Sequence, residues 1–480
     1  MGMQLFTVRQ LREIEQRAAV ELPAETLMQR AGSAAATWIA RRFPRAQQIV
    51  IVCGPGNNGG DGYVCGSVLH ALGRVVECVA LAPPATSDAR AAAARWQSAG
   101  GATRAALSDA NNADLAIDAL FGIGLARPLD GEYLAATRWL SARACVALDL
   151  PSGLDADTGT WVGGTAGVRA TATISFLGAK PGLFTADGID ASGGVVVDPL
   201  GLELPDSDGE LIGPEAFASI VEPRAANTHK GRFGQVVVIG GTTGMTGAAL
   251  LAGRAALRLG AGRVYVDTLD GSMKVDLQQP ELMFRAPDAE DAAPVAVIGC
   301  GLGTSAAARQ RLESALGACA AYVLDADALN LIAADTALAQ RLRRCREPRI
   351  LTPHPLEAAR LLGLSASEVQ ADRVAAARRL AERFDATVVL KGAGSVVATR
   401  ERYWINPTGN AALASAGTGD VLAGMIGALL AQGYDAVRAV LAAVWLHGRA
   451  ADDFGADVGL VAGEVAPLAA RALGRLRGAG

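Results

Sequence analysis

Short apolar segments alternate along the chain with longer stretches whose apolar residues recur at helical spacing. Several short segments are apolar throughout, which is typical of strands covered on both faces of a parallel sheet. In the first half these predicted strands are Ile49–Cys53, Val75–Leu81, Leu115–Ala119, Cys145–Leu148, Thr173–Phe176 and Val195–Val197. The alternation of strand and helix predicts a parallel α/β fold.

A second series of strands and helices follows a stretch of linker-like composition at residues 198–210, which is rich in proline, glycine and acids. Its predicted strands are Gln235–Ile239, Val264–Asp267, Val295–Ile298, Tyr322–Leu324, Arg349–Leu351 and Thr387–Leu390. Val396–Thr399 and Tyr403–Ile405 predict a hairpin that departs from the strict alternation. We therefore expect two α/β domains, at residues 1–205 and 223–480, joined by a linker at residues 206–222.

The first helix carries its own start signal. Thr7 and Gln10 stand three residues apart, which is the spacing of a capping box, where each side chain accepts a hydrogen bond from the backbone of the other residue. The pattern predicts a helix from this point to about Ala19.

Composition fits a globular protein of two large domains, because 480 residues exceed what one core usually holds. A net charge of -4 without a basic cluster gives no sign of a nucleic-acid partner. Seven cysteines without a C-x-x-C pair indicate no disulfide framework and a reducing, cytoplasmic location. The charged start of the chain does not suit a signal peptide, and no membrane partner is expected.

The predicted strand Ile49–Cys53 runs into a polar, glycine-rich loop at residues 54–62, after which a helix begins. Amide groups at such a helix start can bind phosphate or ribose. The loop formally matches the dinucleotide-binding pattern G-x-G-x-x-G, but no acid clearly ends the next strand, so a dehydrogenase is the weaker interpretation. Asn57, Asn58 and Asp61 add polar groups that favour a site for polar ligands or a cation.

Two further strands of the first half end near acids. Asp118 ends one predicted strand, and Asp149 follows another, close to Ser152. Because the carboxyl ends of parallel strands line the ligand crevice of an open sheet, we expect these side chains to meet Asn58. Their oxygens suit an alkali or alkaline-earth cation better than zinc. The alternative is that the two acids merely cap their loops.

The second half contains a candidate phosphoryl-transfer site. The run from Ala416 to Asp420 contains two glycines and directly precedes an apolar helix. The start of a helix offers unpaired N–H donors and the positive end of the helix dipole, which stabilise a phosphoryl group in transfer. Asp420 is then placed to accept the proton of the attacking hydroxyl. The alternative is an ordinary N-capping aspartate.

Glycine-rich loops follow three other strands of the second half, at residues 240–248, 299–303 and 391–395. Lys391 can bring a cation to the phosphates of a nucleotide, whereas a Walker-type site is disfavoured because no G-x-x-x-x-G-K-[ST] occurs. His354 lies between two prolines at a strand end and is a candidate substrate contact. Asp325 and Asp327 are loop acids that equally suit helix caps.

Four motifs of the first half, at residues 27–32, 56–62, 118–122 and 149–153, together resemble the NAD(P)H-hydrate epimerase domain. The resemblance implies a potassium ion on Asn58, Asp118 and Ser152. It also implies that substrate is bound by Asp149 and by Asn57, Asn58, Gly59, Gly60, Asp61, Gly122, Ile123, Gly124, Leu125, Ala126, Arg127 and Pro128. Epimerisation of a carbon that bears a hydroxyl beside the ring nitrogen needs a proton relay, and Asp149 is the candidate catalytic acid–base. Gln29 stands where the family usually has an acid.

Motifs of the second half resemble the NAD(P)H-hydrate dehydratase domain, at residues 230–231, 246–248, 301–303, 325–327, 352–357, 391–394 and 410–420. The resemblance implies Mg²⁺ and a nucleotide, ADP, bound by Lys391, Gly392, Ala393, Gly394, Ser395 and Gly419. It implies that substrate is bound by Ala248, Gly303, His354 and Asp420, with Asp420 catalytic. Met245 replaces a tyrosine that is frequent in relatives.

Together the resemblances cover nearly the whole chain and imply a bifunctional repair enzyme for hydrated NADH and NADPH. The first domain, Rossmann-like with three α/β/α layers, is expected to interconvert the R and S hydrates. The second, ribokinase-like domain is expected to dehydrate the S form with ADP, giving AMP and phosphate. The expected partners are small molecules, and the chain is expected to form a homo-oligomer. A small-molecule kinase and a nucleotide-sensing module with a silent first domain remain alternatives, and the choices of ADP or ATP and of NADH or NADPH hydrate stay open.

Overall fold

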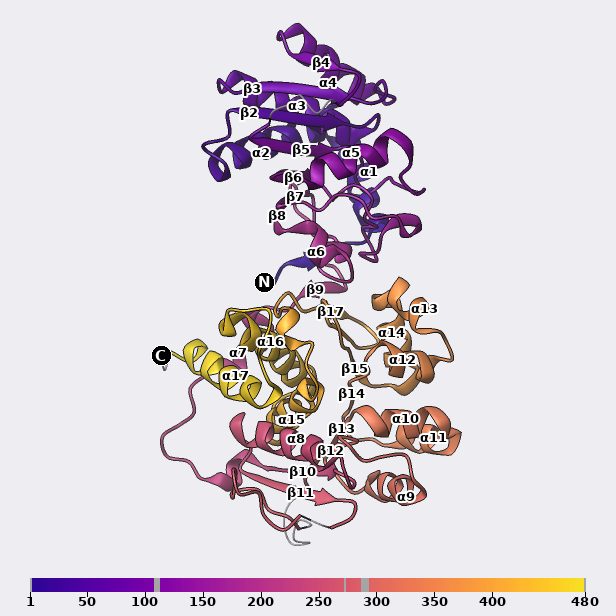
Figure 1. Ribbon diagram of the computed structural model, residues 1–480, viewed down its shortest axis with the longest axis vertical. Helices are drawn as coiled ribbons and strands as arrows, with labels where there is room; N and C mark the ends of the chain where they lie inside the picture. The colour runs from indigo at the N-terminus through magenta and orange to yellow at the C-terminus, as the bar shows by residue number, and fades with distance from the viewer. Residues whose placement is uncertain (1, 108–112, 272, 286–292, 479–480) are drawn as a thin grey trace. The chain divides into compact units, whose positions relative to one another are not determined.

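The computed structural model describes residues 2–107, 113–271, 273–285 and 293–478 (Figure 1). The chain divides into two compact units, Gln4–Gly209 and Glu210–Gly480 with Met1–Met3. We call them the N-terminal unit and the C-terminal unit. Each is built from alternating strands and helices, which confirms the predicted α/β class.

The described residues of the N-terminal unit form a seven-stranded sheet in the order β4-β3-β2-β5-β6-β7-β8, in which every neighbouring pair is parallel. The strands of this sheet are β2 Gln48–Cys53, β3 Val75–Ala80, β4 Ala102–Arg104, β5 Leu115–Ala119, β6 Cys145–Leu148, β7 Ala172–Phe176 and β8 Gly194–Asp198, and the short strand β1 Gln4–Leu5 lies outside it. The helices are α1 Val8–Glu21, α2 Thr26–Arg42, α3 Asn57–Ala71, α4 Ser87–Ser98, α5 Gly131–Ser141 and α6 Gly188–Ser192, with 3-10 turns η1 Val162–Gly164 and η2 Pro181–Leu183.

Strand β2 shows why this sheet is covered on both faces. Its residues are buried from Ile49 to Cys53, and successive side chains point to opposite faces. Ile49 and Ile51 belong to the core formed with α1 to α4, whereas Val50 and Val52 pack with residues of α5. The uniformly apolar strand therefore produces the predicted three-layer α/β/α arrangement.

In the C-terminal unit the described strands run in the order β17-β16-β15-β14-β13-β12-β10-β11, parallel except for the antiparallel pairs at β16. The predicted hairpin is confirmed. The strands are β9 Gly209–Leu211, β10 Gln235–Gly240, β11 Arg263–Thr268, β12 Val295–Ile298, β13 Ala321–Leu324, β14 Arg349–Leu351, β15 Thr387–Leu390, β16 Val396–Ala398 and β17 Tyr403–Ile405.

Helices cover both faces of this sheet, with α9 to α14 on one side and α8, α15, α16 and α17 on the other (Figure 1). They are α7 Ala218–Val221, α8 Thr246–Arg258, α9 Ala306–Ala315, α10 Ala326–Ala334, α11 Thr336–Arg344, α12 Pro355–Leu362, α13 Ala366–Ala371, α14 Arg373–Phe384, α15 Thr418–Ala431, α16 Ala436–Phe454 and α17 Ala462–Leu476, with 3-10 turns η3 Pro214–Phe217, η4 Lys230–Phe233 and η5 Ala411–Leu413. Helix α15 is largely buried, with eleven of its fourteen residues shielded from solvent.

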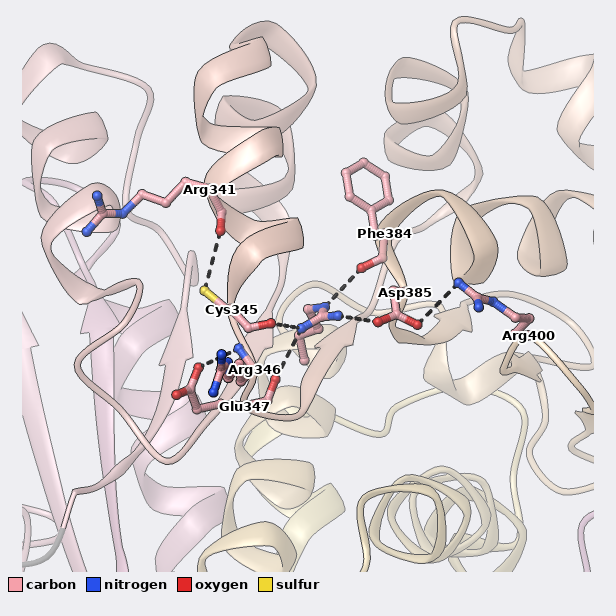
Figure 2. A network of polar contacts seen from close by, with 8 residues as sticks. Arg341, Cys345, Arg346, Glu347, Phe384, Asp385 and Arg400 are labelled. Atoms are coloured by element: carbon pink, nitrogen blue, oxygen red, sulfur yellow. Dashed lines mark hydrogen bonds and ion pairs between the residues drawn. The ribbon is translucent and has the colours of Figure 1, made fainter.

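Arg349, the first residue of β14, connects the sheet to the ends of α11 and α14 through hydrogen bonds (Figure 2). Its guanidinium donates to the carbonyl oxygens of Cys345, at the end of α11, and of Phe384, at the end of α14. It also pairs with Asp385 at 2.6 Å, and Asp385 pairs in turn with Arg400 at 3.5 Å. A cation at these carbonyl-rich helix ends satisfies groups that have no partner inside the helix.

Residues 206–222, expected to be a linker, contain β9, η3 and α7. Ile212, Phe217 and Ile220 in this stretch are buried in the core of the C-terminal unit. The expected placement of a linker at residues 206–222 stays a prediction. Among the described residues, no helix is both long enough and apolar enough to cross a membrane.

Candidate active sites

A cavity of about 820 Å³ lies in the N-terminal unit, within the range of small-molecule sites. Of the residues expected to bind substrate, it is lined by Asn57, Asn58, Asp61, Gly122, Ile123, Gly124, Leu125 and Asp149. They come from the start of α3 and from the loops after β5 and β6, as the rule on strand ends predicts.

The remaining residues of that expected set do not line the cavity. Gly59 lies against the carbonyl oxygen of Gly54, where a Cβ atom would clash, so this glycine serves the close approach of α3 to the strand. Gly60 lies against Met28 in the same way. Ala126, Arg127 and Pro128 lie outside the described lining as well, so their predicted contact with substrate stays a prediction.

Asp118 and Ser152, two of the three residues expected to bind a cation, lie together at the carboxyl ends of β5 and β6, and the third, Asn58, lies in the first turn of α3. Ser152 donates its hydroxyl to Asp118 Oδ1 at 2.6 Å and its amide to Asp118 Oδ2 at 2.8 Å. Asn58 is buried, and neither Oδ1 nor Nδ2 has a hydrogen-bond partner among the described residues. Burial raises the pKa of Asp118 to about 6, even though the bonds from Ser152 and Leu120 lower it. A buried amide without a partner and a buried acid are groups that a cation bound by oxygen would satisfy.

The potassium site that the resemblance implies predicts that replacing K⁺ by tetramethylammonium at equal ionic strength lowers the epimerase activity expected of the N-terminal unit. Asn58→Ala removes one of the oxygens, so the K⁺ concentration for half-maximal activity should rise roughly tenfold. Titration of the epimerisation rate with KCl measures this. An identical KCl curve for wild type and Asn58→Ala would remove Asn58 from the proposed cation site.

Asp149 lines the cavity with its backbone in the left-handed region, at φ 69°. Its Oδ1 forms an ion pair with the ammonium group of Lys180 at 2.6 Å, and the Lys180 side chain is only 1% exposed. Burial, reinforced by the charge of Asp149, raises the pKa of both Asp61 and Glu15. The site therefore combines three acids with one buried cation.

In the C-terminal unit, Asp420 lies in the first turn of α15 but does not cap it. The N-cap is Gly417, at φ 89°, a conformation that favours glycine. The Asp420 carboxyl instead accepts a hydrogen bond from the thiol of Cys300. Burial, together with Asp325, raises the pKa of Asp420 to about 6. The interpretation of Asp420 as the N-cap of α15 is therefore wrong, because Gly417 occupies that position.

A compact polar cluster surrounds Asp420. Ligand atoms of Cys300, Asp325 and Asp420 all lie within 4.8 Å of one another. Lys391 Nζ pairs with Asp325 Oδ1 at 2.5 Å. Burial alone lowers the pKa of Lys391, but Asp325 and Glu357 outweigh it, so the net shift is upward and the side chain stays charged.

A carboxyl group of this cluster fits a magnesium ion, which proteins usually hold with one or two carboxylates plus phosphate oxygens. Asp325 would hold it, which leaves Asp420 free to accept a proton. Cys300 would not, because burial raises the pKa of its thiol well above the ordinary value and keeps it protonated. When bound, the ion would neutralise charge on the phosphoryl group.

The dehydration that the resemblance implies for the C-terminal unit is expected to slow about tenfold per pH unit below pH 6 and to be level from pH 7 to 8. Asp420 accepts a proton only when ionised, and its raised pKa of about 6 sets the midpoint. Rates at saturating ADP and substrate between pH 5 and 8 measure this. A rate that rises as the pH falls would show that Asp420 acts in its protonated form.

The predicted nucleotide loop, residues 391–395, follows β15. The side chain of Arg373 binds the backbone at the start of this loop. That guanidinium is 1% exposed and donates to the carbonyl oxygens of Leu390 and Lys391 at 3.2 and 3.3 Å. Gly419 faces the ammonium of Lys391, since a Cβ atom there would lie 3.2 Å from Nζ. The structure thus brings Lys391 and Gly419 together, as expected of residues that bind one ligand.

His354 is used as a helix cap. Its Nδ1 accepts from the amides of Leu356 and Glu357 at 3.1 and 3.4 Å, and its Nε2 lies 3.2 Å from Glu357 Oε1. Burial, followed by the charge of Lys391, lowers the pKa of His354, which keeps the ring neutral. With 46% of the side chain exposed, contact of His354 with substrate stays a prediction.

Gly303 and Ala248, also expected to bind substrate, lie near the same loops. The amide of Gly303 donates to Asp327 Oδ2 at 2.8 Å, and Ala248 lies in the first turn of α8, beside Gly301. Asp325 and Asp327 are thus an ion-pair partner and a loop anchor, and neither side chain caps α10.

Several residues of these sites are not predicted from the sequence. Lys180 follows β7 and so reaches the same sheet edge as the acids, which is a signal that strand order could have given. Cys300, Arg373 and His447 have no such signal. His447 is buried, its pKa is lowered by burial to about 4, and its Nε2 lies 2.9 Å from the Thr418 oxygen at the start of α15.

Two α/β units, each with a polar site at the carboxyl ends of parallel strands, define an enzyme with two separate active sites. Residues 24–182 match the model of the YjeF-related protein N-terminus, and residues 236–473 match that of NAD(P)H-hydrate dehydratase. The bifunctional NAD(P)H-hydrate repair enzyme Nnr of Coxiella burnetii is 38% identical over 96% of this chain and 98% of its own length. The chain therefore belongs to the family of bifunctional NAD(P)H-hydrate repair enzymes.

Two further similarities concern the C-terminal half. The ADP-dependent (S)-NAD(P)H-hydrate dehydratase of Neisseria meningitidis is 45% identical over 53% of this chain and 89% of its own. A crystal structure of the ADP/ATP-dependent NAD(P)H-hydrate dehydratase of Bacillus subtilis, co-crystallised with ATP and Mg²⁺, matches 55% of this chain and 98% of its own, at 34% identity and a TM-score of 0.49.

Proposed function

We propose that the chain restores NADH and NADPH from their hydrates by two activities. Residues 1–205 would interconvert the R and S hydrates, and residues 223–480 would dehydrate the S form with ADP, giving AMP and phosphate. Family membership supports both activities, and the two matched ranges support their placement. The observation that carries the proposal is the position of the Asp420 carboxyl. It lies at the start of the buried helix α15, beside Lys391 and Asp325, and it does not serve as the N-cap of that helix.

In the C-terminal unit, ionised Asp420 accepts the proton of the substrate hydroxyl as the oxygen attacks the terminal phosphorus of ADP. The bond from that phosphorus to the bridging oxygen breaks, and AMP leaves. Amide groups at the start of α15, including that of Gly419, and the ammonium of Lys391 stabilise the phosphoryl group in transfer. The phosphate ester then departs as inorganic phosphate, a far better leaving group than hydroxide, and the ring double bond forms with loss of a ring proton.

In the N-terminal unit, the substrate would occupy the 820 Å³ cavity with its hydrated ring at Asp149. Asn58, Asp118 and Ser152 would hold a potassium ion that fixes the surrounding loops and helps to bind substrate oxygens. The unpartnered side chain of Asn58 supports this assignment. Asp149 would exchange protons with the substrate hydroxyl while the ring opens and closes.

A mixture of R and S hydrates of NADH, incubated with the protein, ADP, Mg²⁺ and K⁺, tests both activities at once. Absorbance of NADH should rise until the whole mixture is consumed. A rise that does not depend on ADP or ATP would contradict the proposed dehydratase. A rise that stops when the S form is exhausted would contradict the epimerase.

Two expectations stay predictions, a cytoplasmic location and a homo-oligomer. The seven cysteines are all free thiols, six of them buried, which supports a reducing compartment. Size-exclusion chromatography with light scattering measures the oligomeric state.

A further inference from the structure

Lys180 and Asp149 form an ion pair in the N-terminal cavity, and the reaction proposed above gives Lys180 no role. Lys180 Nζ lies 2.6 Å from Asp149 Oδ1, 2.8 Å from Ser175 Oγ and 3.0 Å from the carbonyl oxygen of Phe176. With the Lys180 side chain 1% exposed, this ammonium has a fixed place. The contacts hold the carboxyl of Asp149 in one orientation at the cavity wall.

The charged groups around Asp149 come from several elements. Glu15 and Arg12 reach it from α1, Asp61 from α3 and Lys180 from the loop after β7, and all of them line the cavity. Among these, Asp61 and Glu15 interact electrostatically with Asp149, whereas Arg12 acts on Glu15. Ionising all three carboxyl groups in one cavity is unfavourable because their negative charges repel one another. Burial favours the neutral form of Asp61.

The chemistry of epimerisation needs two protonic groups. Opening the hydrated ring removes a proton from the hydroxyl and delivers one to the ring nitrogen, and closing the ring on the other face reverses both transfers. Asp149 can supply only one of these two groups. A second group with the opposite protonation state must therefore lie in the same cavity.

Building on the proposed epimerase activity, we infer that Lys180 is a positioning residue that holds Asp149 as the proton acceptor, and that Asp61 is the proton donor of the same relay. Asp149 takes the hydroxyl proton, a carbonyl forms, and the carbon–nitrogen bond breaks with its electron pair going to nitrogen. Asp61 gives that nitrogen its proton. After the aldehyde turns its other face, nitrogen attacks, Asp61 recovers its proton, and Asp149 returns its own to the oxygen, with no net change of protons or electrons.

The test uses the full-length protein with purified R hydrate of NADH and K⁺ but without ADP, so that only epimerisation occurs, and chromatography follows formation of the S hydrate. Lys180→Met should lower kcat roughly 10²-fold with little change in KM, and Asp61→Asn should do the same. Lys180→Arg should recover much of the rate.

Ser175→Ala is the matched control, since it removes a neutral partner of the same ammonium and should change the rate only a few-fold. Dehydration of S hydrate with ADP reports that the rest of each variant is intact. A wild-type rate in Lys180→Met, or a wild-type rate in Asp61→Asn, would overturn the relay. If Lys180→Met does not fold, Lys180→Arg and Asp61→Asn decide. A wild type that forms S hydrate no faster than buffer would overturn the proposed epimerase itself.

Discussion

Replacing Asp420 by Asn is expected to lower ADP-dependent dehydration of the S hydrate by roughly 10²- to 10⁴-fold. Asn keeps the size of the side chain but cannot accept the proton of the substrate hydroxyl. The carboxyl of Asp420 does not cap α15, so its loss should leave the helix start intact. Initial rates from NADH absorbance, at saturating ADP and Mg²⁺, measure the effect.

Two controls separate chemistry from folding in that variant. Asp457→Asn removes an exposed acid of the same unit and should keep the wild-type rate. Epimerisation of R hydrate without ADP should also be unchanged in Asp420→Asn. Dehydration by Asp420→Asn within a few-fold of wild type would remove Asp420 from its catalytic role.

Asp149→Asn is expected to lower epimerisation by a similar factor, roughly 10²- to 10⁴-fold, while dehydration of purified S hydrate continues at the wild-type rate. The amide cannot take the hydroxyl proton. It also leaves the ammonium of Lys180 without its carboxylate, and breaking a buried ion pair typically costs about 3–5 kcal/mol of stability. Conversion of R to S hydrate is followed by chromatography, with a thermal melt of the same sample.

Asp190→Asn, an exposed acid of the N-terminal unit, serves as the matched control and should change neither rate nor melting temperature. Undiminished epimerisation by Asp149→Asn would assign the proton transfer to Asp61 or Glu15. It would also support the alternative in which Asp149 only binds Lys180.

The fold follows from the sequence where local pattern and tertiary packing agree. β5, β6 and β12 begin and end as predicted, because each is a short, largely apolar run with a polar residue or glycine at one end, namely Asp114 before β5, Asp149 after β6 and Gly299 after β12. The capping box of Thr7 and Gln10 is present, and the helix continues to Glu21. β4 was not predicted, since its exposed Ala-Thr-Arg sequence has no apolar signal and pairing with β3 alone makes it a strand.

The candidate sites follow from the sequence less completely. Strand ends bring Asp118, Asp149 and Ser152 to one edge, so these residues are predictable from the order of strands. Whether a polar side chain caps a helix or stays available is decided by its neighbours in space, as Asp420 and His354 show in opposite ways. Lys180 is found only when the loop after β7 is placed in space.

The central claim is that the substrate hydroxyl receives the phosphoryl group before it leaves. It is tested most directly with S hydrate of NADH whose hydroxyl carries ¹⁸O, dehydrated with ADP by the Asp149→Asn variant so that ring opening cannot wash out the label. Mass spectrometry of the released phosphate should show one ¹⁸O atom per NADH formed. Phosphate without the label, with ¹⁸O in water instead, would mean that ADP is hydrolysed separately and that Asp420 does not direct phosphorylation of the substrate.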